Sequence, residues 1–449
     1  MRETIPKQLP IVPNPVKHTY ATEIKEISRI LDGLPTLIEA VAKDLARGVR
    51  FPLLGRRGLS AEQVLRAAIW QRSFGLTFEE LAFQVADSGT ARAFCRMDLS
   101  VEPKKSALQR DVSRIRPETW EAINRAVVLV AQAEGIEAGN RARVDSTAMA
   151  SHIEQPTDSG LLNDGVRVLA RLMGRVQEFV PGYRFSKHDR AAKRRMRAIH
   201  DARGKDNKLG PYEDLLRLTQ RTVWSAQRAI VMLRKPDGNR DVDGADKLAN
   251  EIDRVVGLVK RVLDQTRRRV LDGESVPATE KLVSLFETHA DIIRKDHRET
   301  TYGHKVFLTV GEKLITDCFL PRGNPADATL AIDLIQRQQQ ILGSPPRDVA
   351  MDGGFASKDN LAAIKALGVE NVCFSKGRGL TVDQMVDGPA TYRTLRGFRA
   401  GIESFIGFLK GCMGLARCFW RGFQGFQRYV WSTVVTANLL TIARLHLTG

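Results

Sequence analysis

Residues 348–355 read DVAMDGGF, a short apolar run that ends in Asp352, Gly353 and Gly354. A run of this length and composition is typical of a buried strand. An Asp next to such a strand is costly to bury unless it is paired or binds a metal. Ligand and metal sites in open α/β sheets gather at strand ends. The stretch therefore predicts an α/β sheet that presents Asp352 as a candidate functional carboxylate.

The segments around this strand predict the rest of the sheet. A first strand is expected in RARVDSTAMASHI (141–153), which contains Asp145. A hairpin is expected in 301–323, with its turn at 311–313. Further elements are expected as a helix from Pro325 capped by Asn324, a helix over 358–368, a strand over 369–379, and a helix from about Gly401 to the end. Such an order makes a mixed α/β sheet. The helical block 156–297, with heptad-like apolar spacing, is then an insertion after the first strand.

The region before the sheet reads as a string of short helices between 59 and 134. Ser60 is expected to cap the first, and Thr77 with Glu80 forms a capping box for the next. A later helix is basic, with Lys104, Lys105, Arg110 and Arg114. Short helices joined by tight turns are typical of a helix-turn-helix module. An ordinary helical bundle with a solvated basic face explains the spacing equally well.

The charge balance points to a polyanionic partner. The chain has 69 Lys and Arg against 52 Asp and Glu, a net charge of +17, and nucleic acid is the commonest such partner. Residues 184–205, including Arg194 and Arg195, hold nine Lys or Arg against two Asp, which favours phosphate contact over a solvated helix face. No signal peptide, long apolar run or paired-cysteine motif is evident, so we expect a cytoplasmic protein with no membrane partner.

A third carboxylate comes from the C-terminal segment. Glu403 is the one acidic residue between Gly388 and Gly449. With Asp145 and Asp352 it makes a set of hard oxygen ligands, which suits Mg²⁺ or Mn²⁺. Two such ions can flank a phosphodiester. Taken singly, each Asp is also a common turn residue.

The helix around Glu403 adds basic groups to the same face. At about 100° per residue, Arg396, Arg399 and Lys410 fall within about 40° of Glu403. These cations are suited to hold a phosphate strand beside the carboxylate. An exposed charge cluster, worth little energetically, is the alternative.

These residues resemble a DDE transposase of a bacterial insertion sequence, and most closely the ISNCY type with its RNase H-like catalytic domain. The resemblance covers the VDST and MDGGFASKDN segments and an Asn-x-x-Asp element at Asn324 and Asp327. It also includes a signature Tyr-x2-Arg-x3-Glu-x6-Lys, in which Arg399, Glu403 and Lys410 match and Arg396 stands where the family has tyrosine.

The resemblance implies that Asp145, Asp352 and Glu403 form a catalytic, metal-binding triad with, we expect, two Mg²⁺ or Mn²⁺ ions. It implies cleavage of double-stranded DNA at terminal inverted repeats, followed by strand transfer into target DNA by a homodimer or larger assembly. We expect the protein to be nucleoid-associated. The alternatives are an inactive or domesticated DNA-binding repressor and a helical scaffold protein.

The sequence thus predicts an RNase H-like mixed sheet with a long helical insertion after its first strand, preceded by an all-helical DNA-binding module. The expected divisions are a flexible arm (1–20), a helix-turn-helix-like domain (21–135), an RNase H-like catalytic domain (140–155 and 298–449) and a helical insertion (156–297).

Overall fold

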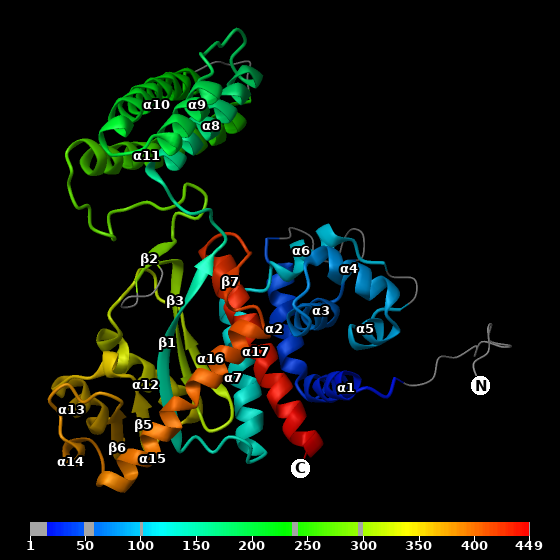
Figure 1. Cartoon of the computed structure of the whole chain (residues 1–449). Coiled ribbons are helices and arrows are strands. Elements are labelled where there is room, and N and C mark those ends of the chain that lie inside the picture. The colour runs from blue at the N-terminus through cyan, green and yellow to red at the C-terminus, as the bar shows by residue number, and fades with distance from the viewer. Residues whose placement is uncertain (1–15, 49–57, 99–101, 236–240, 295–299, 449) are drawn as a thin grey trace, which may run out of the picture. The chain divides into compact units, whose positions relative to one another are not determined.

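The computed structural model describes residues 16–48, 58–98, 102–235, 241–294 and 300–448. Most of the predicted arm lies outside these ranges. The chain forms two compact units (Figure 1). The first comprises 1–147, 305–321 and 325–449, and the second comprises 148–304 and 322–324.

The described part of the first unit begins with helices, and those from α3 to α7 lie where the sequence predicts short helices. They are α1 (Thr19–Asp32), α2 (Pro35–Ala46), α3 (Ala61–Ser73), α4 (Phe78–Asp87), α5 (Gly89–Phe94), α6 (Lys105–Val112) and α7 (Pro117–Ala133). Both predicted caps are confirmed. The Ser60 and Thr77 hydroxyls each accept from the N3 backbone N–H, and the N3 side chains of Gln63 and Glu80 accept from the cap N–H.

The sheet is mixed, as predicted. Its path is β2-β3-β1-β5-β6, with β4 beside β3 and β7 beside β1. Adjacent strands β1 and β5 are parallel, as are β5 and β6, whereas β3 runs antiparallel to β2 and β4. The strands are β1 (Arg141–Ser151), β2 (Asp291–Ile293), β3 (Thr301–Val310), β4 (Ile315–Phe319), β5 (Asp348–Met351), β6 (Asn371–Phe374) and β7 (Arg417–Cys418).

Helices that follow the hairpin complete this unit. They are η3 (Asp327–Leu330), α12 (Ala331–Leu342), η4 (Gly353–Phe355), α13 (Lys358–Ala366), α14 (Val382–Met385), α15 (Pro389–Ala400), α16 (Ile402–Gly411) and α17 (Phe423–Thr448). Phe307, Phe355, Phe374 and Leu395 belong to one buried cluster that joins the strands to these helices. Because Leu395 lies in this cluster, α15 is fixed on the sheet.

Two expectations about these helices are wrong. The helix predicted from Pro325 begins as the 3-10 turn η3, and the cap of that turn is Ala326 rather than Asn324. The C-terminal segment is not one amphipathic helix, since α16 ends at Gly411 and α17 begins at Phe423. Gly414 and Gly422 adopt positive φ in this interval, which breaks the helix and leaves room for β7.

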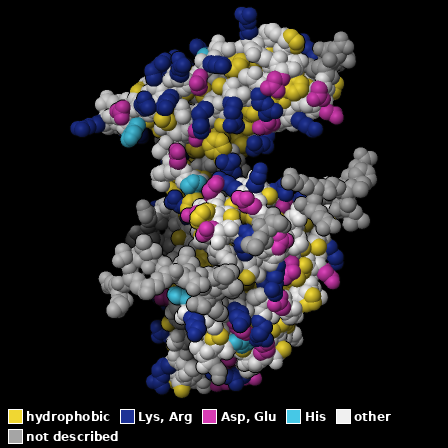
Figure 2. All heavy atoms as spheres, turned by 90° about the vertical axis from the view of Figure 1, so that its right-hand side faces the viewer, with side chains coloured by type: hydrophobic (Ala, Val, Ile, Leu, Met, Phe, Trp, Pro, Cys, Tyr) yellow, Lys and Arg dark blue, Asp and Glu magenta, His cyan; other side chains and the backbone are white. Residues whose placement is uncertain are grey.

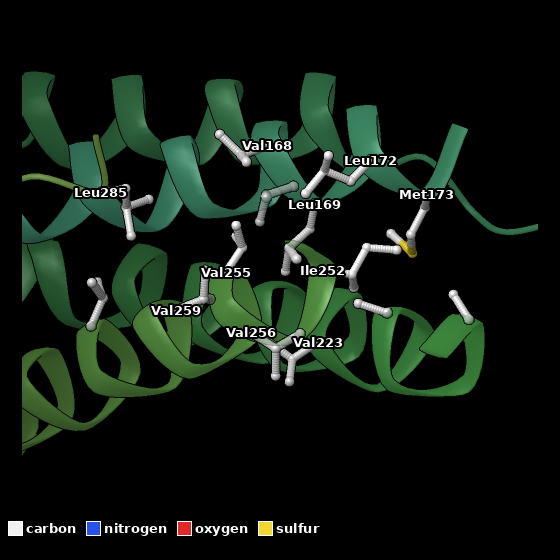
Figure 3. Packing of buried hydrophobic residues seen from close by; sticks show 14 of the residues in the cluster. Val168, Leu169, Leu172, Met173, Val223, Ile252, Val255, Val256, Val259 and Leu285 are labelled. Carbon is white, nitrogen blue, oxygen red and sulfur yellow. The ribbon is translucent and has the colours of Figure 1, made fainter. Parts of the chain in front are cut away.

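The second unit contains the helices of the block 156–297 that the sequence predicts to be helical, but residues 291–293 at the end of that block form the strand β2 instead. It contains α8 (Asp158–Arg175), η1 (Val176–Glu178), α9 (Asp189–Asp201), α10 (Asp206–Leu233), α11 (Val242–Thr266) and the π-helical turn η2 (Arg267–Leu271). Leu169 and Leu172 of α8 pack with Ile252 and Val256 of α11 and with Val223 of α10 (Figure 3). Apolar faces at helical spacing thus bury one another in a bundle with its own core.

Among the described helices, none combines the length and apolarity needed to cross a membrane.

Candidate active site

The strand register brings the two predicted Asp residues together. Val144 of β1 is paired with Met351 of the neighbouring parallel strand β5. Asp145 and Asp352 are the next residues on each strand, so they lie side by side at the carboxyl edge of β5. Parallel neighbours in a sheet are about 4.8 Å apart, which is close enough for two side chains to share one partner.

That shared partner is Arg399, from the last turn of α15. Its Nη2 atom lies 2.8 Å from Asp145 Oδ2 and 3.4 Å from Asp352 Oδ1. Its Nη1 atom lies 3.3 Å from Oε1 of Glu403, in the first turn of α16. One guanidinium therefore contacts all three carboxylates that the sequence singles out.

The three carboxylates differ in exposure. The side chain of Asp145 is 12% exposed, that of Asp352 is 42% exposed and that of Glu403 is 69% exposed. The site is thus closed on the β1 side and open to solvent on the α16 side. A large anionic substrate can approach from the open side.

Further polar residues hold the two Asp side chains in place. The Ser146 N–H donates to Asp145 Oδ1 at 2.7 Å, and the Ser146 hydroxyl donates to Asp327 Oδ2 at 3.1 Å. Lys305 Nζ lies 2.9 Å from Asp327 Oδ1. Asp327 and Lys305 therefore form an ion pair beside the Ser146 hydroxyl, next in sequence to Asp145. Sequence reasoning noted Asp327 only as part of a resemblance and gave Lys305 no role.

Asp352 is oriented from the neighbouring strand end. The Ser375 hydroxyl, just after β6, donates to Asp352 Oδ1 at 2.8 Å and accepts from the Gly353 N–H at 2.9 Å. A Cβ atom on Gly353 would lie 2.8 Å from Cβ of Lys376. The glycine after Asp352 thus allows the loops after β5 and β6 to approach closely.

Sequence reasoning missed Arg143, which fixes the junction between α15 and α16. It lies two residues before Asp145 and so on the same face of β1. Its Nη1 donates to the Phe398 carbonyl at 2.8 Å, and its guanidinium stacks on the rings of Phe398 and Phe405. Burial lowers the pKa of this guanidinium. The sequence did contain a signal for Arg143: an arginine is unusual in an apolar strand, and this one lies two residues before a candidate catalytic Asp.

Gly401 is the point where this contact is closest. A Cβ atom there would lie 2.3 Å from Arg143 Nη1. The glycine between the helices therefore makes room for the guanidinium that positions Arg399 on one side and Glu403 on the other.

The predicted metal triad is not a preformed metal cage. Within the described ranges, no three His, Cys, Asp or Glu side chains are arranged to hold a metal ion. Arg399 instead lies among the carboxylates, with its side chain 17% exposed. The three predicted ligands are nevertheless gathered from three elements around a single cation.

The other two predicted DNA-contacting residues near this site, Arg396 and Lys410, differ in exposure. Arg396 is exposed, with its guanidinium 5.7 Å from the centre of the Tyr392 ring, and it has no ion pair with any described residue. The single helix for which the shared face was predicted is interrupted at Gly401, between α15 and α16, so a charge cluster of Arg396 with Glu403 stays a prediction. Lys410 lies half-buried in the last turn of α16.

The predicted DNA-contacting residues of the N-terminal helices lie on α6 and at its two ends. Lys105 pairs with Glu79 of α4 at 2.7 Å, and Arg110 pairs with the adjacent Asp111 at 2.8 Å. Arg114 donates to the Arg47 carbonyl, and Lys104 is the exposed N-cap residue of α6. In the second unit, Arg194 is exposed, whereas Arg195 is half-buried on the side of α9 nearest Asp214 of α10.

Residues 264–439 match the family model described as "Transposase DDE domain". This match covers less than half of the chain, and it includes Asp352, Arg399 and Glu403 but not Asp145. A search of curated proteins and a search of solved structures returned no match. The family match supports the resemblance to a DDE transposase.

Proposed function

We propose that the protein is a DDE transposase that cuts double-stranded DNA at the ends of its insertion sequence and transfers the freed strand into target DNA. The observation that carries this proposal is the convergence of Asp145, Asp352 and Glu403 on Arg399. The family match over 264–439 supports the same activity. The ISNCY type and the bacterial origin are part of the proposal.

The donor set fits the two Mg²⁺ or Mn²⁺ ions that the family implies. Three carboxylates meet one guanidinium, so the cluster keeps an excess of negative charge that a divalent cation would offset. All the donors are hard oxygens, which Mg²⁺ prefers. When bound, such ions activate an attacking oxygen and stabilise the leaving oxygen of a phosphodiester.

We assign Asp145, Asp352 and Glu403 as the residues that would hold the ions. Their oxygens contact Arg399, which would compete with a bound metal ion for these carboxylates. Its planar guanidinium is suited to a bidentate contact with a DNA phosphate. The exposed Glu403 side of the site is where that phosphate can enter.

The remaining residues orient this machinery. The Ser146 N–H holds Asp145, and the Ser375 hydroxyl holds Asp352, so both Asp side chains are oriented before substrate arrives. Lys410, two helical turns after Glu403, is assigned to the DNA backbone beside the cut. Preorganised groups of this kind accelerate phosphoryl transfer because they need little rearrangement during the reaction.

We also propose that the N-terminal helices bind the terminal inverted repeats. Lys104, Lys105, Arg110 and Arg114 of the α6 region are the assigned contacts. Lys105 and Arg110 already pair with acidic side chains, so DNA phosphates would have to compete for them. Synapsis of two ends calls for a homodimer or a larger assembly.

The test is an in vitro reaction with a labelled DNA that carries the sequences flanking the gene, with Mg²⁺. We expect 3′-hydroxyl ends and strand-transfer products from the wild type, and neither from Asp352→Asn. Asp359→Asn is the matched control, because Asp359 is an exposed carboxylate on α13 of the same unit. Equal cutting by the wild type and Asp352→Asn contradicts the proposal. DNA binding without cutting by the wild type favours a repressor.

A further inference from the structure

Helix α9 of the second unit carries a face of exposed cations. At about 100° per residue, Arg190, Lys193, Arg194 and Arg197 fall within an arc of about 100°. All four are exposed. The opposite side of the helix holds Ala192 and Ile199, which are buried in the bundle core. The helix is therefore fixed by its apolar side and presents the basic face to solvent.

These four cations lack an acidic partner among the described residues. None of them makes an ion pair with another described residue of the chain. Some arginines elsewhere in the same bundle do: Arg167 pairs with Asp164, and Arg175 with Glu251. Arg217 and Arg234 are likewise paired, with Asp214 and Asp253. Exposed arginines such as Arg171 of α8, Arg221 of α10 and Arg254 of α11 also make no ion pair with a described residue. Helix α9 differs in that four such cations lie on one face within two helical turns, available for an external anion.

The charge of the bundle is unevenly distributed. Helix α9 has five Lys or Arg and two Asp, which are its first and last residues. Helix α11, by contrast, has five Asp or Glu and four Lys or Arg. Lys and Arg side chains are spread over the visible face of the bundle (Figure 2). A polyanion would therefore be attracted to the α9 side.

We propose that the face of α9 formed by Arg190, Lys193, Arg194 and Arg197, the α9 face, binds the phosphate backbone of duplex DNA without reading its sequence. This inference rests on the proposed function, because it takes DNA to be the substrate. The four residues span seven steps of helix, about 10 Å. Duplex DNA carries about six phosphates over that length of its axis, enough for each cation to meet a separate phosphate.

Arg195 is not part of the α9 face. It is half-buried, its Nη1 donates to the Ala191 carbonyl, and its Nε lies 3.9 Å from Asp214 Oδ2. The sequence alone placed Arg195 beside Arg194 as a DNA contact. Because consecutive residues of a helix are rotated by about 100°, Arg195 points away from the face that contains Arg194.

The test compares two variants of the full chain that lose the same charge. The first replaces the α9 face by Arg190→Gln, Lys193→Gln, Arg194→Gln and Arg197→Gln. The control replaces paired arginines of the same bundle by Arg167→Gln, Arg175→Gln, Arg217→Gln and Arg234→Gln. Affinity for a fluorescent duplex is measured by anisotropy over a range of salt concentrations, and circular dichroism verifies that helix content is kept.

Each lost phosphate contact reduces the steepness of the plot of log K against log salt concentration by about 0.9. The slope of the α9-face variant should therefore be about 3 to 4 less negative than that of the wild type. The control should keep the wild-type slope. A wild-type slope in the α9-face variant, or an equal loss in the control, overturns the inference while leaving the proposed function intact. Failure of the wild type to bind duplex DNA at all contradicts the proposed function itself.

Discussion

Replacing Gly401 by Ala should loosen the junction that aligns Arg399 with Glu403. The added Cβ would lie 2.3 Å from Arg143 Nη1, well inside contact distance. A long side chain at the surface would swing away at little cost. Arg143 is only 7% exposed and is confined between the rings of Phe398 and Phe405, so it cannot do so without losing contacts.

The magnitude follows from those contacts. Losing the hydrogen bond from Arg143 to the Phe398 carbonyl costs about 1.5–3 kcal/mol, as for other charged donors. Weaker stacking on the two rings adds about 0.5–1 kcal/mol. Ala in a helical conformation recovers about 0.5–1 kcal/mol relative to Gly. The net loss of unfolding free energy is then about 2 kcal/mol.

Urea denaturation followed by circular dichroism measures this loss. Gly407→Ala in α16 is the matched control, since no atom lies within 4 Å of the Cβ it would add. That control should gain about 0.5–1 kcal/mol. Adding Arg143→Met to Gly401→Ala should remove most of the penalty specific to Gly401. If Gly401→Ala is as stable as Gly407→Ala, the tight fit at the helix junction is refuted.

Three other perturbations test the packing of the two units. Arg337→Met should cost about 3–5 kcal/mol, because it leaves the fully buried Asp317 without its counter-charge; a urea-measured loss under about 1 kcal/mol would contradict this. Gly165→Ala should destabilise the helical bundle by about 1–3 kcal/mol, since its Cβ would lie 2.8 Å from buried Val259, and an unchanged Tm would argue against that contact. Burial lowers the pKa of His304 below its usual 6.5, so the unfolded chain binds the proton more readily and stability should fall as pH drops through about 6.5. His304→Gln should flatten that pH dependence, and an equally steep profile in the variant would exclude His304 as its source.

The sequence predicted the features that depend on neighbouring residues. The cap at Ser60 and the capping box of Thr77 with Glu80 form within a single helical turn, so a short local pattern suffices to identify them. Asp145 and Asp352 were found because each lies in or just after an apolar strand. Glu403 stood out as a lone carboxylate in a basic segment.

What escaped prediction depends on contacts between distant parts of the chain. Arg143 meets Phe398 across 255 residues, and Ser146 meets Asp327 across 181. The local periodicity of the sequence does not predict contacts between residues so far apart in the chain. The helix break after Gly411 was missed for a related reason, since the glycines that permit it also occur inside helices, as Gly407 does.

The central claim is that Asp145, Asp352 and Glu403 act as one metal-dependent cutting site. The most direct measurement is single-turnover cleavage of end-containing DNA by Asp145→Asn, Asp352→Asn, Glu403→Gln and their pairwise combinations. Residues that work as a unit lose activity non-additively, so each double variant should cut no more slowly than its slower single variant, and each single variant should lose about 10³-fold or more. Losses that multiply in the double variants, or wild-type cutting by Glu403→Gln, would contradict the account.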